Sequence, residues 1–136
     1  MEKYLTEDLS VPSNGIQLLL RCKKHASPND LMYPSHAHII GALLNLITNP
    51  EIVHNIIIIY YARHGSHYPL TEDGKDDETE YIEALCPINY NTPGDNGKHV
   101  PDISNYIFNT ILTLISLSKG HQITVILDCC HSGGVS

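Results

Sequence analysis

Apolar residues recur at helical spacing in two stretches of the chain. In each stretch they lie three or four residues apart, the spacing of one helix face: Ile39, Ile40, Leu43, Leu44 and Ile47, and then Ile107, Ile111, Leu114 and Ile115. Ser35 is a suitable N-cap for the first helix, and Asn49-Pro50 ends it. The second helix is expected to end near Lys119-Gly120, because glycine is a common helix stop.

Unbroken apolar runs predict the strands. Residues 56–61 are isoleucines followed by two tyrosines, and residues 123–127 read Ile-Thr-Val-Ile-Leu. Runs of β-branched and aromatic residues are typical of strands that are buried on both faces in a parallel sheet. A third run, residues 16–20, predicts another buried strand. Residues 1–9 are expected to hold the end of a helix, and residues 21–35 and 65–102 are expected to form loops.

This alternation of strands and helices predicts an α/β fold with a mostly parallel sheet flanked by helices. The chain has 136 residues, which suffices for one domain with a modest core. Hydrophobic residues make up 42% and charged residues 17%, so the composition is that of a folding chain.

Charge and hydropathy narrow the range of partners. The net charge is −7 and the only arginines are Arg21 and Arg63, whereas a nucleic-acid-binding protein normally carries a basic patch. No run approaches the roughly 18 apolar residues of a membrane span, and the N-terminus lacks a signal-peptide layout. We therefore expect no nucleic-acid or membrane partner, a cytoplasmic location, and free thiols at the four cysteines.

Reactive side chains follow two of the predicted strands. The run 56–61 leads into His64, Gly65 and Ser66, and the run 123–127 leads into a segment that reads Asp-Cys-Cys-His-Ser-Gly over residues 128–133. Because the carboxyl ends of parallel strands lie at one edge of a sheet, the histidine and the cysteines can meet there. A cysteine nucleophile needs such a base or cation to raise its thiolate fraction.

These two motifs resemble the catalytic loops of metacaspases and related caspase-fold cysteine peptidases. A buried strand that ends in Asp-x-Cys-His-Ser-Gly is similar to their nucleophile loop, and a strand that ends in His-Gly-Ser is similar to their histidine loop. Other segments resemble caspase-like domains of fungal proteins, so the likeness covers nearly the whole chain: residues 4–9, 16–20, 46–50, 82–87 and 124–133. The resemblance implies a caspase-like three-layer fold.

The resemblance also implies roles for individual residues. Cys130 would be the nucleophile of a cysteine-type endopeptidase, and His64 would be its general base and acid. The backbone N–H groups of Gly65 and Cys130 would hold the oxyanion. Asp128 would lie in the substrate pocket and favour Arg or Lys before the scissile bond. The partner would be a peptide or protein substrate.

The chain departs from the family pattern in three respects. Arg63 stands before the histidine, where the family usually has glycine, and a position that needs positive φ would be strained by arginine. The first strand of the family domain and its C-terminal elements are missing. Residues 1–136 therefore correspond to a partial caspase-like domain, its large-subunit-like region. The competing hypothesis is an inactive fragment or pseudo-peptidase that acts as a binding or regulatory module.

Several residues keep a simpler interpretation. Cys130 could be a buried structural thiol and His64 a surface histidine, were it not for their paired motifs. Cys129 is expected to be a small packing residue. Asp128 either ends its strand and caps the turn or lines the pocket. A zinc site at residues 129–131 is disfavoured, because three consecutive side chains cannot easily share one tetrahedral ion.

The implied reaction needs no cofactor. Calcium is the one ion for which the sequence offers candidate ligands. Some metacaspases need calcium, and an acidic cluster follows the histidine loop: Asp73, Asp76, Asp77, Glu78 and Glu80. Carboxylate oxygens suit this ion. However, their spacing is not that of an EF-hand, and Asn105 stands where relatives tend to have Asp. A solvated acidic loop is the simpler interpretation of the cluster.

Overall fold

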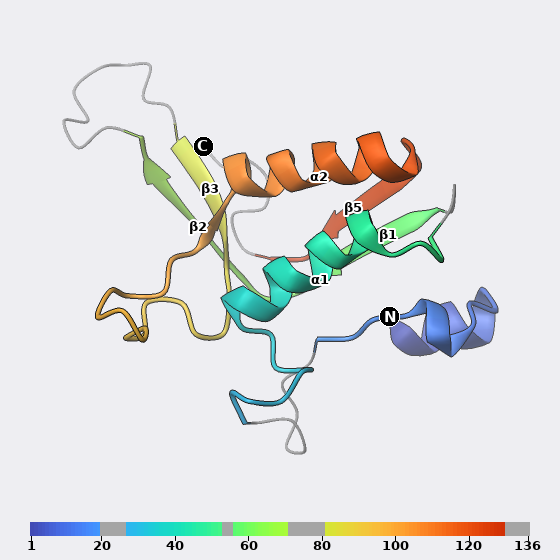
Figure 1. The fold of residues 1–136 in the computed structure, drawn as a ribbon, viewed down its shortest axis with the longest axis horizontal. Coiled ribbons are helices and arrows are strands. Elements are labelled where there is room, and N and C mark those ends of the chain that lie inside the picture. Colours follow the sequence, from blue (N-terminus) through green and yellow to red (C-terminus); the bar gives the residue numbers. More distant parts are fainter. Residues whose placement is uncertain (20–26, 53–55, 71–80, 130–136) are drawn as a thin grey trace. The chain divides into compact units, whose positions relative to one another are not determined.

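The computed structural model describes residues 1–19, 27–52, 56–70 and 81–129. The chain divides into two compact units, residues 1–34 and residues 35–136. The larger unit contains the two long helices and all the strands of the described residues (Figure 1).

The smaller unit contains two short helical turns. A π-helical turn spans Tyr4–Asp8 and a 3-10 turn spans Ser13–Gly15, so the expectation of helix within residues 1–9 is confirmed. The strand predicted for residues 16–20 is wrong for residues 16–19, and residue 20 lies outside the described residues. Ile16 has an extended backbone, with φ −115° and ψ 118°, but its N–H donates to Ser13 O at 3.2 Å. A strand also needs a ladder partner, which these residues lack among the described parts of their unit.

Helix α1, His36–Thr48, begins and ends where its sequence pattern predicts. The Ser35 hydroxyl accepts a hydrogen bond from His38 N at 3.2 Å, which satisfies one of the free N–H groups of the first turn. Ile39 and Leu43 are its buried residues. The helix therefore packs through one apolar stripe.

Helix α2, Asn105–Lys119, has the same construction. The Ser104 hydroxyl accepts from Ile107 N at 3.4 Å, and Gly120 follows the helix with φ 98°. A positive φ of this size favours glycine, which explains why the helix stops there. Phe108, Ile111 and Ile115 form its buried stripe.

The parallel pair predicted from the two apolar runs is present. Strand β1, Ile57–Tyr61, pairs in parallel with β5, Ile123–Leu127. Burial on both faces is wrong, however, because Ile58 is 44% exposed and Ile126 is 39% exposed, whereas Ile57 is buried. Side chains alternate across a strand, so one face of this pair is open while the other packs.

A second, antiparallel sheet lies in a segment that the sequence predicts to be mostly loop. Its strands are β2, His64–Pro69, β3, Tyr81–Cys86, and the short β4, Ile103–Ser104, in the order β2-β3-β4. The loop prediction for residues 65–102 is therefore wrong over these strands. Polar residues adopt β structure here because cross-strand pairing outweighs their weak local preference.

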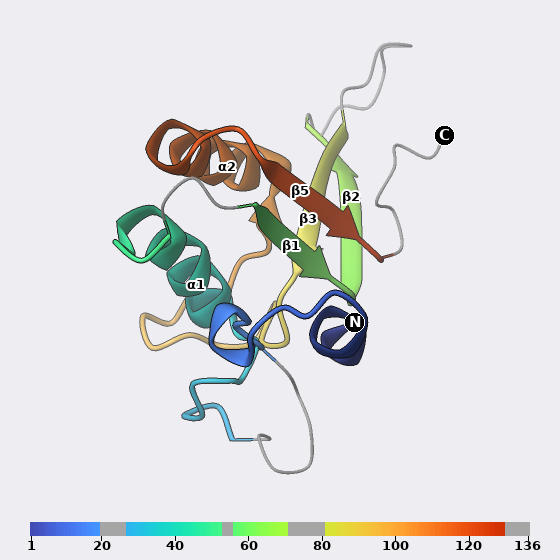
Figure 2. The ribbon, with the colours of Figure 1, turned by 90° about the vertical axis from the view of Figure 1, so that its right-hand side faces the viewer.

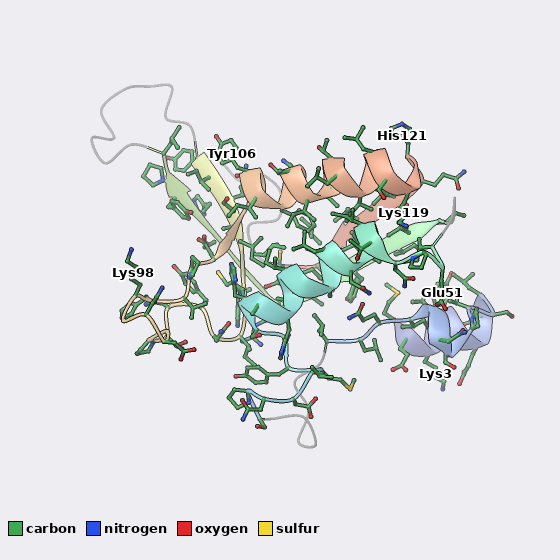
Figure 3. The ribbon with its side chains drawn as sticks, in the orientation of Figure 1. Lys3, Glu51, Lys98, Tyr106, Lys119 and His121 are labelled. Carbon is green, nitrogen blue, oxygen red and sulfur yellow. The ribbon has the colours of Figure 1, made fainter. Side chains whose placement is uncertain are left out.

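The two long helices lie on the same side of the β1–β5 pair (Figures 1 and 2). Lys119 Nζ donates to Asn49 O at 2.7 Å, and Ser118 Oγ donates to Ile47 O at 3.0 Å. Figure 3 shows Lys119 above the end of α1. Ile103 and Ile115 are fully enclosed, so the centre of the core lies between α2 and the antiparallel sheet.

The predicted α/β class is confirmed, with helices packed on a parallel pair and with an antiparallel sheet added to it. Within the described ranges, no helix combines the length and the apolar character that a membrane crossing requires.

Candidate active site

The carboxyl ends of β1 and β5 lie side by side. Tyr61, the last residue of β1, is the register partner of Leu127, the last residue of β5. The ladder extends one step further, because Asp128 N donates to Tyr61 O at 2.7 Å. The two segments that carry the candidate chemistry therefore leave the sheet at the same edge, as the sequence predicts.

His64 begins the antiparallel sheet directly after this edge. It is the first residue of β2, its side chain is exposed, and its register partner is Cys86 at the end of β3. Gly65 follows it on the same strand, opposite Leu85. The strand pairing thus defines the backbone of both the histidine and the glycine.

Tyr61 forms hydrogen bonds with the backbone at the start of β2 and at the end of β3. The Tyr61 hydroxyl lies 3.0 Å from His64 O and 2.8 Å from Cys86 O, so it donates to the carbonyls of two register partners. Burial raises the pKa of Tyr61 well above its usual value, and the nearby Cys86 acts in the same direction. The Arg63 guanidinium acts in the opposite direction and lowers this pKa. Tyr61 therefore stays a hydrogen-bond donor throughout the physiological pH range.

Asp128 has a partner on the neighbouring strand. Its carboxylate oxygen Oδ2 accepts a hydrogen bond of 3.0 Å from the Tyr60 hydroxyl. This bond, together with partial desolvation and the carboxylate charge, raises the pKa of Tyr60. Both side chains are exposed. A carboxylate with a fixed orientation at the edge of the sheet is suited to bind a cation.

Cys129 is half-buried. It lines a cleft together with residues of β3, β4, α2 and the end of β5, and the polar members of that lining are Glu83, Asn105 and Cys129. Asn105 Oδ1 is buried and has no hydrogen-bond partner within the described part of the chain.

Arg63 does not impose the backbone strain that its position suggested. Among the described non-glycine residues, only Ser10 and Asn91 have positive φ, so Arg63 keeps an ordinary backbone. The cost lies in its side chain instead, because Nε is buried without a hydrogen-bond partner in the described structure. A buried donor without a partner costs about 1–3 kcal/mol.

Comparisons with known proteins assign this chain to a family. A family model described as "Metacaspase, peptidase C14 domain" matches residues 1–136. The chain belongs to the metacaspase family. It is 31% identical to Metacaspase-6 of Arabidopsis thaliana over 102 residues, which cover 75% of this chain and 24% of that protein.

Two further metacaspases show the same relation. Metacaspase-1A of Neurospora crassa is 29% identical over 107 residues, which cover 79% of this chain and 21% of that protein. Metacaspase-4 of Arabidopsis thaliana is 25% identical over 135 residues, which cover 99% of this chain and 28% of that protein. This metacaspase chain therefore spans only about a quarter of the length of these relatives.

Part of the metacaspase motif lies outside the described residues. These parts are Cys130 and the His131-Ser132-Gly133 segment, and the acidic residues 73–80 of the candidate calcium cluster also lie outside the described residues. Among the residues that the structure does describe, no group of three or more His, Cys, Asp or Glu side chains could hold a metal ion. Of the residues predicted for the site, the structure describes His64, Gly65 and Asp128. Asp128 directly follows β5 at the edge where β1 ends, and His64 and Gly65 begin β2 shortly after β1.

Sequence reasoning missed the two tyrosines of this metacaspase edge. The sequence predicts Tyr60 and Tyr61 to lie in a buried strand, yet their hydroxyls reach Asp128 on one side and the His64 backbone on the other. One signal could have revealed them. A tyrosine hydroxyl at a buried strand end needs a hydrogen-bond partner, and alternation sends consecutive side chains to opposite faces.

Proposed function

We propose that this chain carries the catalytic residues of a cysteine-type endopeptidase that cleaves after Arg or Lys. The observation that supports this most strongly is the register of the two strands. Tyr61 and Leu127 are register partners at the ends of these strands. His64 is the third residue after Tyr61, and Cys130 is the third residue after Leu127. A thiol nucleophile needs a base near it, and two parallel strands that end at the same edge would bring His64 and Cys130 within reach of each other.

In the proposed reaction His64 takes the proton of the Cys130 thiol. The thiolate attacks the peptide carbonyl, and backbone N–H groups of Gly65 and Cys130 stabilise the oxyanion. The C–N bond then breaks, and the amine leaves with the proton held by His64. Water, deprotonated by His64, attacks the resulting thioester, and its C–S bond breaks to release the acid and the thiolate.

Asp128 is the residue proposed to select the substrate. Its carboxylate would pair with the Arg or Lys side chain before the scissile bond, because a fixed carboxylate binds a guanidinium through charge-assisted hydrogen bonds. The hydrogen bond from Tyr60 to Oδ2 supports this role, since it fixes the orientation of the carboxylate. A peptide or protein with a basic residue is therefore the proposed substrate, and the cytoplasm is the proposed location.

The proposed chemistry needs no cofactor, because the thiolate and the imidazole supply the nucleophile and the acid. Calcium is proposed only as a regulator held by the acidic residues 73–80. Oxygen ligands of that kind suit calcium. Turnover measured with added calcium and with a chelator tests this part separately.

The first experiment measures hydrolysis of fluorogenic peptides that end in Arg, Lys or Asp by the full chain. We expect Cys130→Ala and His64→Ala to abolish turnover. Two matched controls remove the same chemical groups close by, Cys129→Ala for the thiol and His67→Ala for the imidazole, and both should retain turnover. His67 lies on β2, as His64 does, and the centroid of its ring lies 5.6 Å from that of Tyr81.

Absence of Cys130-dependent turnover in a chain shown to be folded would overturn the proposal. The competing function is a non-catalytic metacaspase-like binding module. The observation that favours it is the buried, unpartnered Nε of Arg63 next to the candidate histidine.

A second experiment tests the specificity. Asp128→Asn should lower kcat/KM for Arg- and Lys-terminated peptides by about tenfold or more, because a charge-assisted hydrogen bond becomes a neutral one. An equal effect on Asp-terminated peptides would assign Asp128 to the structure of the loop instead.

A further inference from the structure

Tyr61 forms hydrogen bonds with the backbone of His64, of Cys86 at the end of β3, and of Asp128 after β5. We infer that Tyr61 is a positioning residue for the His64 imidazole, an inference that rests on the proposed catalytic role of His64. Tyr61 does not touch the reacting atoms in this proposal. It acts through the main chain, by fixing where β2 begins.

The side chain of Tyr61 makes the first connection. Its hydroxyl reaches His64 O at 3.0 Å and Cys86 O at 2.8 Å. A phenol has a single proton, so the two carbonyls share one donor. His64 and Cys86 are register partners at the end of the β2–β3 ladder. The hydroxyl therefore binds both carbonyls of the last residue pair of this ladder, the pair that contains the histidine.

The main chain of Tyr61 makes the second connection. Its carbonyl accepts a hydrogen bond of 2.7 Å from Asp128 N, the first residue after β5. One residue thus binds the start of the histidine strand through its side chain and the start of the Asp128 segment through its backbone. Tyr61 therefore ties the start of β2 to the backbone of Asp128.

The location of the hydroxyl makes the connection durable. Tyr61 is half-buried, and burial raises its pKa, so the donor proton is retained at working pH. Tyr60, its neighbour, is directed to Asp128 and cannot replace it. Removal of the Tyr61 hydroxyl would leave both carbonyls without this donor and would free the first residue of β2.

The test compares Tyr61→Phe with Tyr68→Phe. Tyr68 lies on the same strand as His64, and its hydroxyl donates to Asp102 Oδ1 at 3.4 Å, so the control loses a comparable group without touching the His64 backbone. The first readout is the NMR resonance of the His64 imidazole. We expect Tyr61→Phe to shift that resonance and Tyr68→Phe to leave it unchanged.

The second readout is kinetic. Tyr61→Phe should lower kcat for an Arg-terminated peptide by about tenfold with KM little changed, because small misplacements of a catalytic group mainly affect the chemical step. The two readouts separate the hypotheses. If the native chain shows no turnover, the proposed function fails, while the His64 resonance still decides whether Tyr61 positions the histidine.

An unchanged His64 resonance in a folded Tyr61→Phe chain would overturn the inference, as would an equal shift in Tyr68→Phe. If Tyr61→Phe does not fold, 4-aminophenylalanine incorporated at position 61 keeps an N–H donor at the same place on the ring. We expect this residue to restore the native His64 resonance. Failure to restore it in a folded chain would also count against the positioning role.

Discussion

The hydroxyl of Tyr60 donates a 3.0 Å hydrogen bond to Asp128 Oδ2, from the strand that leads to the histidine to the residue that follows the other parallel strand. This bond joins two exposed side chains. Tyr61, which is half-buried, joins the same two segments through the hydrogen bond from Asp128 N to its carbonyl. The two consecutive tyrosines thus form hydrogen bonds on opposite faces of the end of β1. The exposed link acts on a carboxylate and the half-buried link acts on the backbone, so their effects can be measured separately.

The Tyr60–Asp128 bond predicts a change in the titration of Tyr60. The pKa of Tyr60 is raised mainly because its proton is donated to Asp128, and because the carboxylate charge disfavours the phenolate. Asp128→Asn removes the charge, so the pKa of Tyr60 should fall toward its ordinary value. NMR titration of labelled tyrosine measures this shift. An identical midpoint in both proteins would mean that the bond is not formed in solution.

The Arg63 side chain predicts a stabilising substitution. Its Nε is buried without a partner in the described structure, and such a donor carries a desolvation cost. Arg63→Met keeps most of the aliphatic stem and removes the donor, so the free energy of unfolding should rise by up to about 1 kcal/mol. Urea unfolding measures the change. The control is Lys98→Met at an exposed loop position (Figure 3), where we expect a change within about 0.5 kcal/mol.

A decrease in stability for Arg63→Met would contradict this interpretation. It would show that the guanidinium makes a favourable interaction that outweighs its buried Nε. The same variant can be tested for turnover, because Arg63 is the departure from the family pattern that lies closest to His64.

The parts of the fold that the sequence predicted well are those with a strong local signal. Helix α1 follows from Ser35 and the apolar spacing behind it, and α2 ends at Gly120, which has the positive φ that glycine tolerates. The parallel strands follow from their unbroken apolar runs. In each case the determinants lie within a few residues of the element itself.

The parts that failed depend on partners distant in sequence. The antiparallel strands β2 and β3 are polar, and their pairing of His64 with Cys86 cannot be inferred from local preference. The run 16–20 is apolar enough for a strand, but no ladder forms in its described part. In the candidate site, His64 and Asp128 follow from motifs at strand ends. Tyr60 and Tyr61 do not, because a tyrosine in an apolar strand first indicates packing.

The buried stripe of α2 predicts a sharp contrast between two nearby residues. Ile115 is fully buried, whereas Leu117 on the same helix is 76% exposed. Ile115→Ala removes packed methyl groups and leaves a cavity, so we expect a loss of about 2–5 kcal/mol in the free energy of unfolding. Leu117→Ala removes an exposed side chain from the same helix and should change stability by no more than about 0.5 kcal/mol. Urea unfolding of both variants tests the packing of α2, and equal losses would contradict it.

The buried phenol of Tyr61 predicts a loss of stability at alkaline pH. Its pKa is raised in the folded chain above the value near 10 expected in the unfolded chain, mainly by burial. Above pH 10 the unfolded chain therefore releases a proton that the folded chain retains. The stabilising contribution is complete below pH 10 and is lost as the pH rises toward the folded-state pKa.

Tyr61→Phe removes this titration, so its stability should fall less steeply above pH 10 than that of the native chain. The difference in slope should stay below about 1.4 kcal/mol per pH unit, the limit for one proton, because the phenol is only partly buried and solvent screens it. Urea unfolding between pH 8 and about pH 11 measures both slopes. Tyr60 and Tyr68, whose pKa values are also raised, titrate in both proteins and cancel in the comparison. Parallel curves would show that the Tyr61 proton is released equally easily from the folded and the unfolded chain.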